Sequence, residues 1–381
     1  MALSAATFTL TGACLTLPGT LLPILLEQFQ IRLVEAGSMF ALQPIGYLLS
    51  VLAAAQLIGR FGMRAMLAAA LCTSAVGLVG FGLVSHWVVG AVMMCLFGLG
   101  LGIFEVAANM LLIIIGGERR ANVLNLAHLF FGVGSFIGPL LSTRAVAAGL
   151  SWRVTFAIGG AAVAGVSAGW SLLRLDAIAP RSPGPPDGSR HTARRSRLAL
   201  LLALLLAVYV GVEMGVGAWL TKYMVAVRAT TLVYAGNTLS LYWLGLAAGR
   251  LILSRSSHYF REETLNLVLA LGAAGALTAA LLVPGPATAT ACFALAGLGF
   301  SGIFPAAIAL GGRYHPHDTA GATSVMVAGA GLGGIVIPWL MSAVADRAGL
   351  VAGMIFYVAV AAGLVILALV VKRAIGLHSH A

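Results

Sequence analysis

Charged side chains are scarce in this sequence, since only 9% of its 381 residues are Asp, Glu, Lys or Arg. Apolar residues make up 60% of the chain, against ~45–50% in a typical soluble domain. This composition excludes a soluble globular protein. Long unbroken apolar runs also exclude a transmembrane β-barrel, whose strands alternate over ~10 residues. We expect an all-α polytopic membrane protein, because lipid requires each spanning segment to satisfy its own backbone hydrogen bonds.

Recognisable catalytic and metal-binding motifs are also missing. The four cysteines all fall in apolar segments without metal-ligand spacing, and we interpret them as buried structural thiols: Cys14, Cys72, Cys95 and Cys292. No nucleotide-binding loop, nucleophile triad or metal cluster is present in the sequence. The chain is therefore expected to be neither an enzyme nor an ATP-driven pump, and to need no metal.

Negative charge is in short supply, with 11 Asp and Glu against 22 Lys and Arg and a formal net charge of +11. In a soluble protein this excess would suggest a nucleic-acid partner. In an apolar chain, orientation in the membrane explains it better, so we expect no nucleic acid. If the apolar runs alternate in direction, sixteen basic residues lie on the side of both termini and six on the other. The positive-inside rule then predicts cytoplasmic termini.

Apolar runs long enough to cross a bilayer occur twelve times. They lie at roughly 5–27, 36–58, 65–84, 88–115, 121–147, 153–173, 199–224, 231–254, 264–283, 286–311, 319–344 and 350–371. A stretch rich in Pro, Gly and Arg interrupts them and is expected to be a flexible linker. We predict an N-terminal six-helix bundle at 1–174, a cytoplasmic linker at 175–197 and a C-terminal six-helix bundle at 198–381.

The two halves carry an internal repeat at an offset of 199 residues. The matched pairs are Gly12 with Gly211, Gly37 with Gly236, Gly46 with Gly245, Gly134 with Gly333, and Pro139 with Pro338. In addition, GLGLGIFEVAA at 98–108 reappears as GLGFSGIFPAA at 297–307, shifted by one residue. An offset that holds across four helices predicts two tandem bundles of the same architecture.

Twelve helices in a six-plus-six repeat with a basic linker resemble the major facilitator superfamily along the whole chain. That family carries a loop motif G-x-x-x-D-[RK]-x-G-[RK]-[RK] after its second helix. In AQLIGRFGMR, at 55–64, Arg60, Gly62 and Arg64 fit this motif, whereas Gly59 replaces the acidic residue. Within the superfamily, four phrases are similar to the fucose/glucose/galactose permeases, which are sugar:proton symporters. They are EVAAN (105–109), LNLAHLFFGVGSFIGP (124–139), YVGVEMGVGAWL (209–220) and AGNTLSLYWLGLAAGR (235–250).

Three ionisable side chains in the predicted spanning helices are candidates for proton coupling. Glu105 lies about eleven residues, or ~16 Å, from a charged turn at 116–120, which places its carboxylate near mid-bilayer. The charged form is disfavoured there, so the group can hold or release a proton, and the resemblance implies this role. Glu213 lies midway along 199–224, and His128 could pair with Glu105. For each of them, a structural role in joining helices is the alternative.

Polar and aromatic side chains at similar depths are candidate substrate ligands, because amide, phenol and indole groups bind hydroxyl-rich solutes. They are Asn109, Asn125, Asn237, Tyr242, Trp243 and Gln43. The resemblance implies that a polar residue near Asn125 contacts the sugar. Asparagines also join helices, and Tyr and Trp also anchor helices at membrane interfaces, so both interpretations stay open.

These observations predict a secondary active transporter that works by alternating access. The leading hypothesis is proton-coupled uptake of a sugar or similar small polar solute. The alternative is proton-driven efflux of drugs or metabolites, for which Gly134-x-x-x-Gly138-Pro139 is mild evidence. A non-transporting receptor forms a third class. We expect a monomer in the inner membrane, with lipid and a small-molecule substrate as partners and no cofactor. The coupling ion is expected to be the proton, with sodium not excluded.

Overall fold

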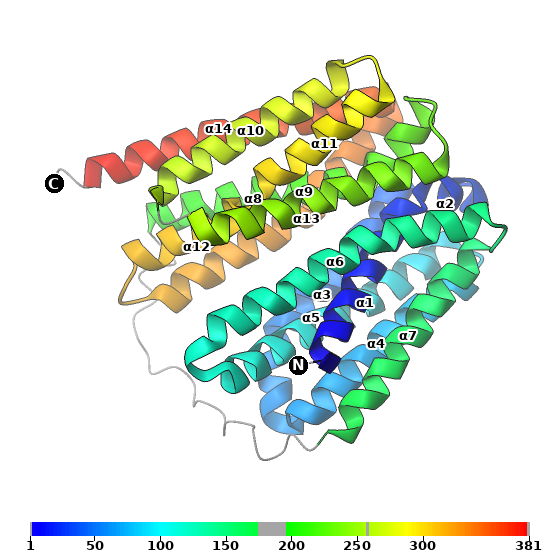
Figure 1. The fold of residues 1–381 in the computed structure, drawn as a ribbon, viewed down its shortest axis with the longest axis horizontal. Coiled ribbons are helices and arrows are strands. Elements are labelled where there is room, and N and C mark those ends of the chain that lie inside the picture. Colours follow the sequence, from blue (N-terminus) through cyan, green and yellow to red (C-terminus); the bar gives the residue numbers. More distant parts are fainter. Residues whose placement is uncertain (1, 174–195, 257–258, 379–381) are drawn as a thin grey trace. The chain divides into compact units, whose positions relative to one another are not determined.

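α-Helices make up nearly all the secondary structure of this computed structural model, which describes residues 2–173, 196–256 and 259–378 (Figure 1). The chain divides into two compact units, residues 1–186 and 187–381. The division falls inside the predicted linker at 175–197, of which 175–195 lie outside the described residues. The predicted domain boundaries therefore stay predictions.

Each unit is a bundle of long helices. The first contains α1 (Ala2–Thr20), α2 (Leu22–Phe29), α3 (Leu33–Phe61), α4 (Met63–Leu83), α5 (Trp87–Gly116), the short 3-10 helix η1 (Gly117–Arg119), α6 (Arg120–Ala147) and α7 (Trp152–Leu172). The second contains α8 (Arg197–Ala226), α9 (Leu232–Ser256), α10 (Glu262–Leu282), α11 (Pro286–Phe300), α12 (Ile303–Tyr314), α13 (Thr319–Ala348) and α14 (Leu350–His378). Every predicted apolar run coincides with one of these helices or with a consecutive pair.

Eleven helical segments of the described chain are long and apolar enough to cross a membrane, which confirms the predicted polytopic α-helical class. The twelfth predicted run is α9, which has 25 residues and is less apolar than the other long helices. Its polar side chains Thr238, Ser240 and Tyr242 are buried in the second unit. Protein neighbours, rather than lipid, therefore surround the polar part of α9.

The helices of the two units pair in the same order. In the first unit the most extensive contacts are α3 with α5, α1 with α6, and α4 with α5 and α7. In the second unit they are α8 with α13, α9 with α11, and α10 with α11 and α14. In both units, the first spanning segment thus packs on the fifth, the second on the fourth and the third on the sixth. The repeat seen in the sequence is a repeat of packing.

Glycines let α3 and α5 approach each other closely. A Cβ atom on Gly46 would lie 2.2 Å from the carbonyl oxygen of Cys95, and one on Gly98 only 1.9 Å from that of Gln43. Neither helix can accept a side chain there without moving apart, because the obstructing atoms belong to the backbone. Small residues at such crossings are the usual means by which membrane helices pack without a hydrophobic driving force.

The second unit repeats this crossing with the matched glycines. On α9 and α11, Cβ atoms at Gly245 and Gly297 would each lie 2.1 Å from a backbone carbonyl oxygen of the other helix. The α1–α6 and α8–α13 pairs follow the same rule at Gly134 and Gly333, where the corresponding distances are 1.9 Å and 1.8 Å. The conspicuous glycine offset therefore marks the positions where helix backbones touch.

The two units differ at two spanning segments, and at the first of them α1 and α2 are separated at Leu21 whereas α8 is continuous. Whereas α5 is continuous, its counterpart breaks at Ser301 and Gly302, between α11 and α12. This turn contains the one-residue shift in the repeat and places Pro305 in the first turn of α12. Proline is tolerated there because it lacks only a donor that a helix start leaves unpaired. The position equivalent to Glu105 is thus occupied by a residue that helps to restart a helix.

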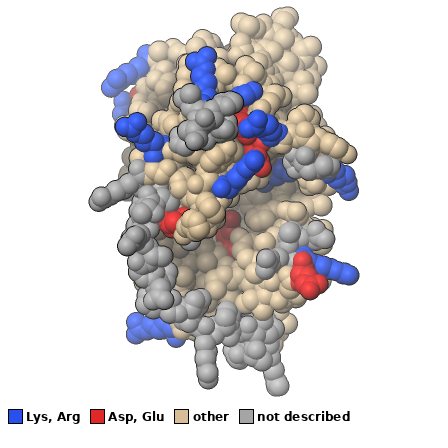
Figure 2. All heavy atoms as spheres, turned by 90° about the vertical axis from the view of Figure 1, so that its left-hand side faces the viewer, with Lys and Arg blue, Asp and Glu red and all other residues tan. Residues whose placement is uncertain are grey.

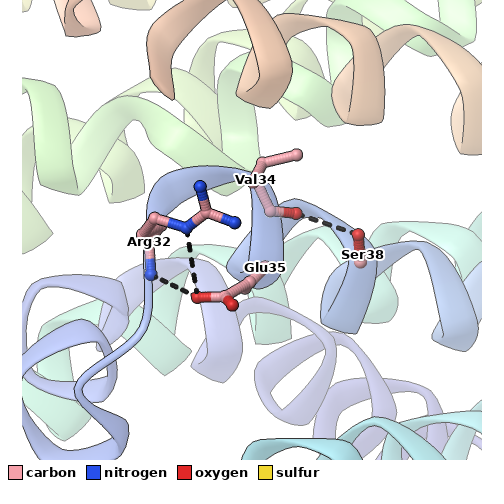
Figure 3. A network of polar contacts seen from close by, with 4 residues as sticks. All are labelled: Arg32, Val34, Glu35 and Ser38. Carbon is pink, nitrogen blue, oxygen red and sulfur yellow. Dashed lines mark hydrogen bonds and ion pairs between the residues drawn. The ribbon is translucent and has the colours of Figure 1, made fainter. Parts of the chain in front are cut away.

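Polar contacts at the start of α3 fix where this helix begins (Figure 3). The backbone N–H of Arg32 donates to the Glu35 carboxylate across 2.7 Å, and the Arg32 guanidinium lies 3.8 Å from the same oxygen. A carboxylate in the first turn also interacts favourably with the helix dipole. One turn on, the Ser38 hydroxyl donates to the Val34 carbonyl oxygen across 2.9 Å. These contacts set the start of the helix that carries Tyr47.

Figure 2 shows Lys and Arg side chains on the surface of the chain, with fewer Asp and Glu side chains. This picture agrees with the excess of Lys and Arg in the composition. Which side of the membrane the basic side chains occupy stays a prediction of the positive-inside rule.

The prediction of four buried thiols is wrong for three of them. Cys14 is 3% exposed, but Cys72 is exposed, and Cys95 and Cys292 are only partly buried. The Cys72 thiol lies 3.3 Å from the Ser167 hydroxyl. The physical reason is that the outer face of a membrane helix is as apolar as its inner face. An apolar segment therefore does not imply a buried residue.

The close α3–α5 crossing leads to a stability prediction. Gly98→Ala should destabilise the protein by about 1–3 kcal/mol, because the added methyl group overlaps a backbone carbonyl. Gly165→Ala on α7 is the matched control, since nothing lies within 4 Å of its added Cβ atom. The control should leave the thermal midpoint of the purified protein unchanged or slightly higher. Equal midpoints for the two variants would contradict the packing described for this crossing.

Candidate functional site

A hydrogen bond between Tyr47 and Glu105 joins α3 to α5 inside the first unit. The Tyr47 hydroxyl donates to Oε2 of Glu105 across 2.9 Å, and both side chains are partly buried. Phe104 and Leu101 on the same helix are buried. A hydrogen bond to a carboxylate in such apolar surroundings is stronger than one in water. The first unit thus holds its mid-helix acid in a defined position.

The glycine crossing places Tyr47 opposite this acid. Cβ atoms on Gly98 and Gly102 would lie 3.0 Å from the backbone nitrogen and 2.6 Å from the backbone oxygen of Tyr47. Glu105 follows these glycines by two turns and one turn along α5, so its side chain projects from the same face. Tyr47 was not among the site residues predicted from the sequence. Its only signal was its place directly after the repeat glycine Gly46.

Asn109 lies one turn beyond Glu105 on α5. Its Oδ1 atom is buried and has no hydrogen-bond partner in the described part of the chain. A buried acceptor that stays unpaired costs about 1–3 kcal/mol, which favours the arrival of a donor from water or a ligand. Gln43, one turn before Tyr47 on α3, is also partly buried, and its backbone oxygen lies at the glycine crossing.

His128 and Asn125 come from α6. The His128 ring packs edge-on against Phe8 of α1 at 5.6 Å between centroids, and Phe8 lies 5.3 Å from Phe104, the residue before Glu105. The rings of Phe8 and Phe104 therefore link His128 to the residue that precedes Glu105. Direct pairing of His128 with Glu105 stays a prediction. Asn125 is exposed on the surface of the unit, where a solute could reach its amide.

The predicted loop motif lies between α3 and α4. Gly62 ends one helix and precedes the next with a φ of +84°, a conformation that favours glycine. The Arg60 guanidinium lies 5.3 Å from the centre of the Phe61 ring, and Arg64 is in the first turn of α4. The glycine of the motif thus has a clear structural reason. The role of the two arginines stays a prediction.

In the second unit, Glu213 on α8 faces Arg250 on α9. Glu213 is 5% exposed, and its Oε1 atom lies 3.9 Å from Nη2 of Arg250. From the sequence, Arg250 was only one of the sixteen basic residues expected on the side of both termini. A long side chain can reach a residue on another helix, and no local sequence pattern reveals this partner.

Aromatic residues of the second unit surround this pair. The Tyr242 hydroxyl donates to the backbone oxygen of Glu213 across 2.9 Å, so its role in this structure is to join α8 and α9. Trp243 packs edge-on against Tyr242 at 5.3 Å, and its buried Nε1 has no hydrogen-bond partner among the described residues. Asn237 lies earlier on α9, before Tyr242, and is partly buried. Substrate contacts of these three residues stay predictions.

Comparison with known proteins identifies the family. The family model described as Major Facilitator Superfamily matches residues 4–322. Among curated proteins, the yeast Bypass of stop codon protein 6 (Saccharomyces cerevisiae) is 29% identical over 147 residues, which span 37% of this chain and 28% of that protein. The human Sodium-dependent glucose transporter 1 is 36% identical over 55 residues, 14% of this chain and 11% of that protein. The chain thus matches under a third of each relative's length.

Solved structures share the fold over almost the whole chain. A variant of the nucleoside transporter NupG has a TM-score of 0.81 at 13% identity and covers 97% of both chains. A variant of the fucose:proton symporter FucP of E. coli has a TM-score of 0.63 at 22% identity, with 97% of this chain and 98% of that chain covered. At such identities, the likeness shows the fold alone.

The contact between Tyr47 and Glu105 can be measured in a double-mutant cycle. Tyr47→Phe should cost about 1–2 kcal/mol in the wild-type background, because it removes a hydrogen bond to an ionisable acceptor. The same substitution in a Glu105→Ala background should cost almost nothing. Reversible unfolding in mixed detergent micelles gives the four free energies. An equal cost of Tyr47→Phe in both backgrounds would show that the two side chains do not interact.

Proposed function

This chain belongs to the major facilitator superfamily, and we propose that it is a proton-coupled importer of a sugar or similar small polar solute. Family membership makes it a multi-pass membrane transporter rather than an enzyme. The proposal adds the substrate class, the direction and the coupling ion. It also includes an inner-membrane location with cytoplasmic termini and a monomeric state.

The observation that carries the proposal is the hydrogen bond between Tyr47 and Glu105 in an apolar helix pair. An ionised Glu105 accepts this hydrogen bond. When the carboxyl group is protonated, it gains a donor of its own. Asn109, whose buried Oδ1 has no described partner, is its neighbour one turn along α5 and can receive that hydrogen bond. Protonation would thus exchange one set of polar contacts for another, as a coupling site requires.

The substrate class is supported by the chemistry of polar side chains in each unit. In the first unit Asn125 carries an amide and His128 a ring nitrogen, and in the second unit Asn237 carries an amide; all are suited to the hydroxyl groups of a sugar. The names of two similar proteins, a glucose transporter and a fucose:proton symporter, favour the same class. The first of these names specifies sodium, so the experiment below includes a sodium gradient.

Efflux remains the alternative, but packing accounts for the motif that suggested it. A Cβ atom on Gly134 would lie 1.9 Å from the carbonyl oxygen of Thr9, and one on Gly138 2.6 Å from that of Ala13. These glycines therefore serve the α1–α6 crossing. The counterpart of Gly134 in the second unit, Gly333, makes the same backbone contact, so the crossing belongs to the fold.

The proposal predicts a specific defect for Glu105→Gln. Protein in liposomes, tested with labelled glucose, galactose and fucose, should accumulate solute when the outside is more acidic. One proton per solute and one pH unit sustain about tenfold accumulation. Glu105→Gln should lose this accumulation and retain exchange of labelled for unlabelled solute, because only the proton step is removed. Glu118→Gln, exposed at the turn after α5, is the matched control and should behave as wild type.

The outcomes separate the possibilities. Accumulation by Glu105→Gln at the wild-type level would remove Glu105 from the coupling mechanism. Accumulation that follows a sodium gradient instead of a pH gradient would show sodium as the coupling ion. Expulsion of an amphiphilic drug by the wild-type protein, with no uptake of the sugars, would favour the efflux alternative.

A further inference from the structure

We propose that Arg250 forms an anion-binding site in the second unit. Ionised Glu213 pairs with Arg250 until Glu213 takes up a proton and the carboxylate of a solute binds Arg250 in its place. This inference rests on the proposed transport function and narrows its substrate class to small hydroxylated monoanions, such as sugar acids. Arg250 and Glu213 lie on α9 and α8 of the second unit, whereas Tyr47 and Glu105 belong to the first unit.

Arg250 has unused capacity to bind an anion. Its side chain is 42% exposed, and its ion pair with Glu213, at 3.9 Å, is too long for a hydrogen bond. A guanidinium carries five N–H donors in a planar fork that matches a carboxylate. The existing contact therefore neutralises the charge without saturating the donors. A ligand carboxylate could approach from the exposed side and form the bidentate contact that Glu213 does not make.

Glu213 requires a positive neighbour when it is ionised, because it is almost fully buried. The titratable groups that interact electrostatically or by hydrogen bonding with Glu213 are Arg250 and Tyr242 on α9 and Tyr209 on α8. Tyr357 of α14 packs against α8 as well and acts on Tyr242. The helices α11, α12 and α13 also contact α8, but they add no such group within the described chain. Among the described residues, Arg250 is thus the one cation on which the Glu213 charge depends.

Competition for Arg250 couples a proton to an anion. While Glu213 is ionised, the pair is neutral and the carboxylate repels an incoming anion. Once Glu213 is protonated, the guanidinium is uncompensated and attracts one negative charge. Each ligand therefore raises the affinity for the other, as linkage requires. A monoanion matches the single charge that Glu213 gives up, which favours a carboxylate over a doubly charged phosphate ester.

Unpaired donors near the pair favour an acceptor-rich ligand. The buried hydroxyl of Tyr357 and the buried Nε1 of Trp243 have no hydrogen-bond partner among the described residues, whereas the Tyr209 hydroxyl interacts with Glu213 and Arg250. Tyr209 lies one turn before Glu213 on α8. The other two rings pack on the glycines that follow it: a Cβ atom would lie 2.3 Å from the Tyr357 hydroxyl at Gly215 and 2.7 Å from the Trp243 ring at Gly217. Carboxylate and hydroxyl oxygens of a sugar acid supply the acceptors that this region lacks.

Binding to the purified full-length protein tests the proposal without requiring transport. Titration calorimetry is performed with gluconate, glucuronate and galacturonate, and with glucose and galactose as neutral counterparts. At least one acid should bind more tightly than the neutral sugars, and its affinity should rise about tenfold per unit of falling pH while Glu213 is ionised. Arg250→Gln should lose this binding. Glu213→Gln should keep it and remove its pH dependence.

Matched variants keep the result interpretable. Arg255→Gln, an exposed arginine on the same helix, should bind the acid as wild type does. Arg250→Lys should restore part of the affinity, which separates loss of charge from misfolding. Failure of all three acids to bind, or equal binding by Arg250→Gln and wild type, would overturn the proposal.

The proposed function can fail separately. Glu105→Gln should bind the acid normally, since Glu105 lies in the other unit. Binding of the acid without any coupled transport would contradict the proposed function but not the anion-binding site. Glu105-dependent uptake of a neutral sugar without binding of the acids would contradict the anion-binding site alone.

Discussion

The backbone contact between α3 and α5 is the constraint on which the candidate coupling site depends. Gly46 and Gly98 bring the two helices so close that a methyl group on either would overlap a carbonyl oxygen of the other. At that separation, a tyrosine on one helix spans the gap to a glutamate on the other, 58 residues later in the chain. A wider crossing would leave the acid without its donor in apolar surroundings, where an unpaired carboxylate is costly.

The second unit shows that the close helix crossings and the polar side chains near them vary independently. The same glycine crossings recur between α9 and α11 and between α8 and α13. However, the equivalent of Glu105 is Pro305, and Glu213, a buried acid of this unit, lies on another helix and faces an arginine. Packing requires small residues at fixed places and leaves the remaining positions open. The two units can therefore share one architecture and carry different chemistry.

The sequence was sufficient for the helices and the repeat, because both follow from patterns that are local or periodic. Apolar runs gave the spanning segments, and the glycine offset marked the crossings before their partners were known. Tyr47 and Arg250 could not be found in this way, since each acquires its meaning from a residue on another helix. Cys72 shows the opposite error: an apolar neighbourhood suggested burial, but lipid-facing and protein-facing sides of a helix have the same composition. Charge, distance and exposure of side chains need the folded bundle.

Infrared difference spectroscopy of the reconstituted protein tests the central claim most directly, because it observes protonation of the Glu105 carboxyl group itself. Acidification should produce a carboxylic C=O band that is absent in Glu105→Gln and displaced in Tyr47→Phe, and adding a transported solute should shift it. If no pH-dependent band disappears with Glu105→Gln, this side chain does not exchange a proton, and the coupling scheme is wrong.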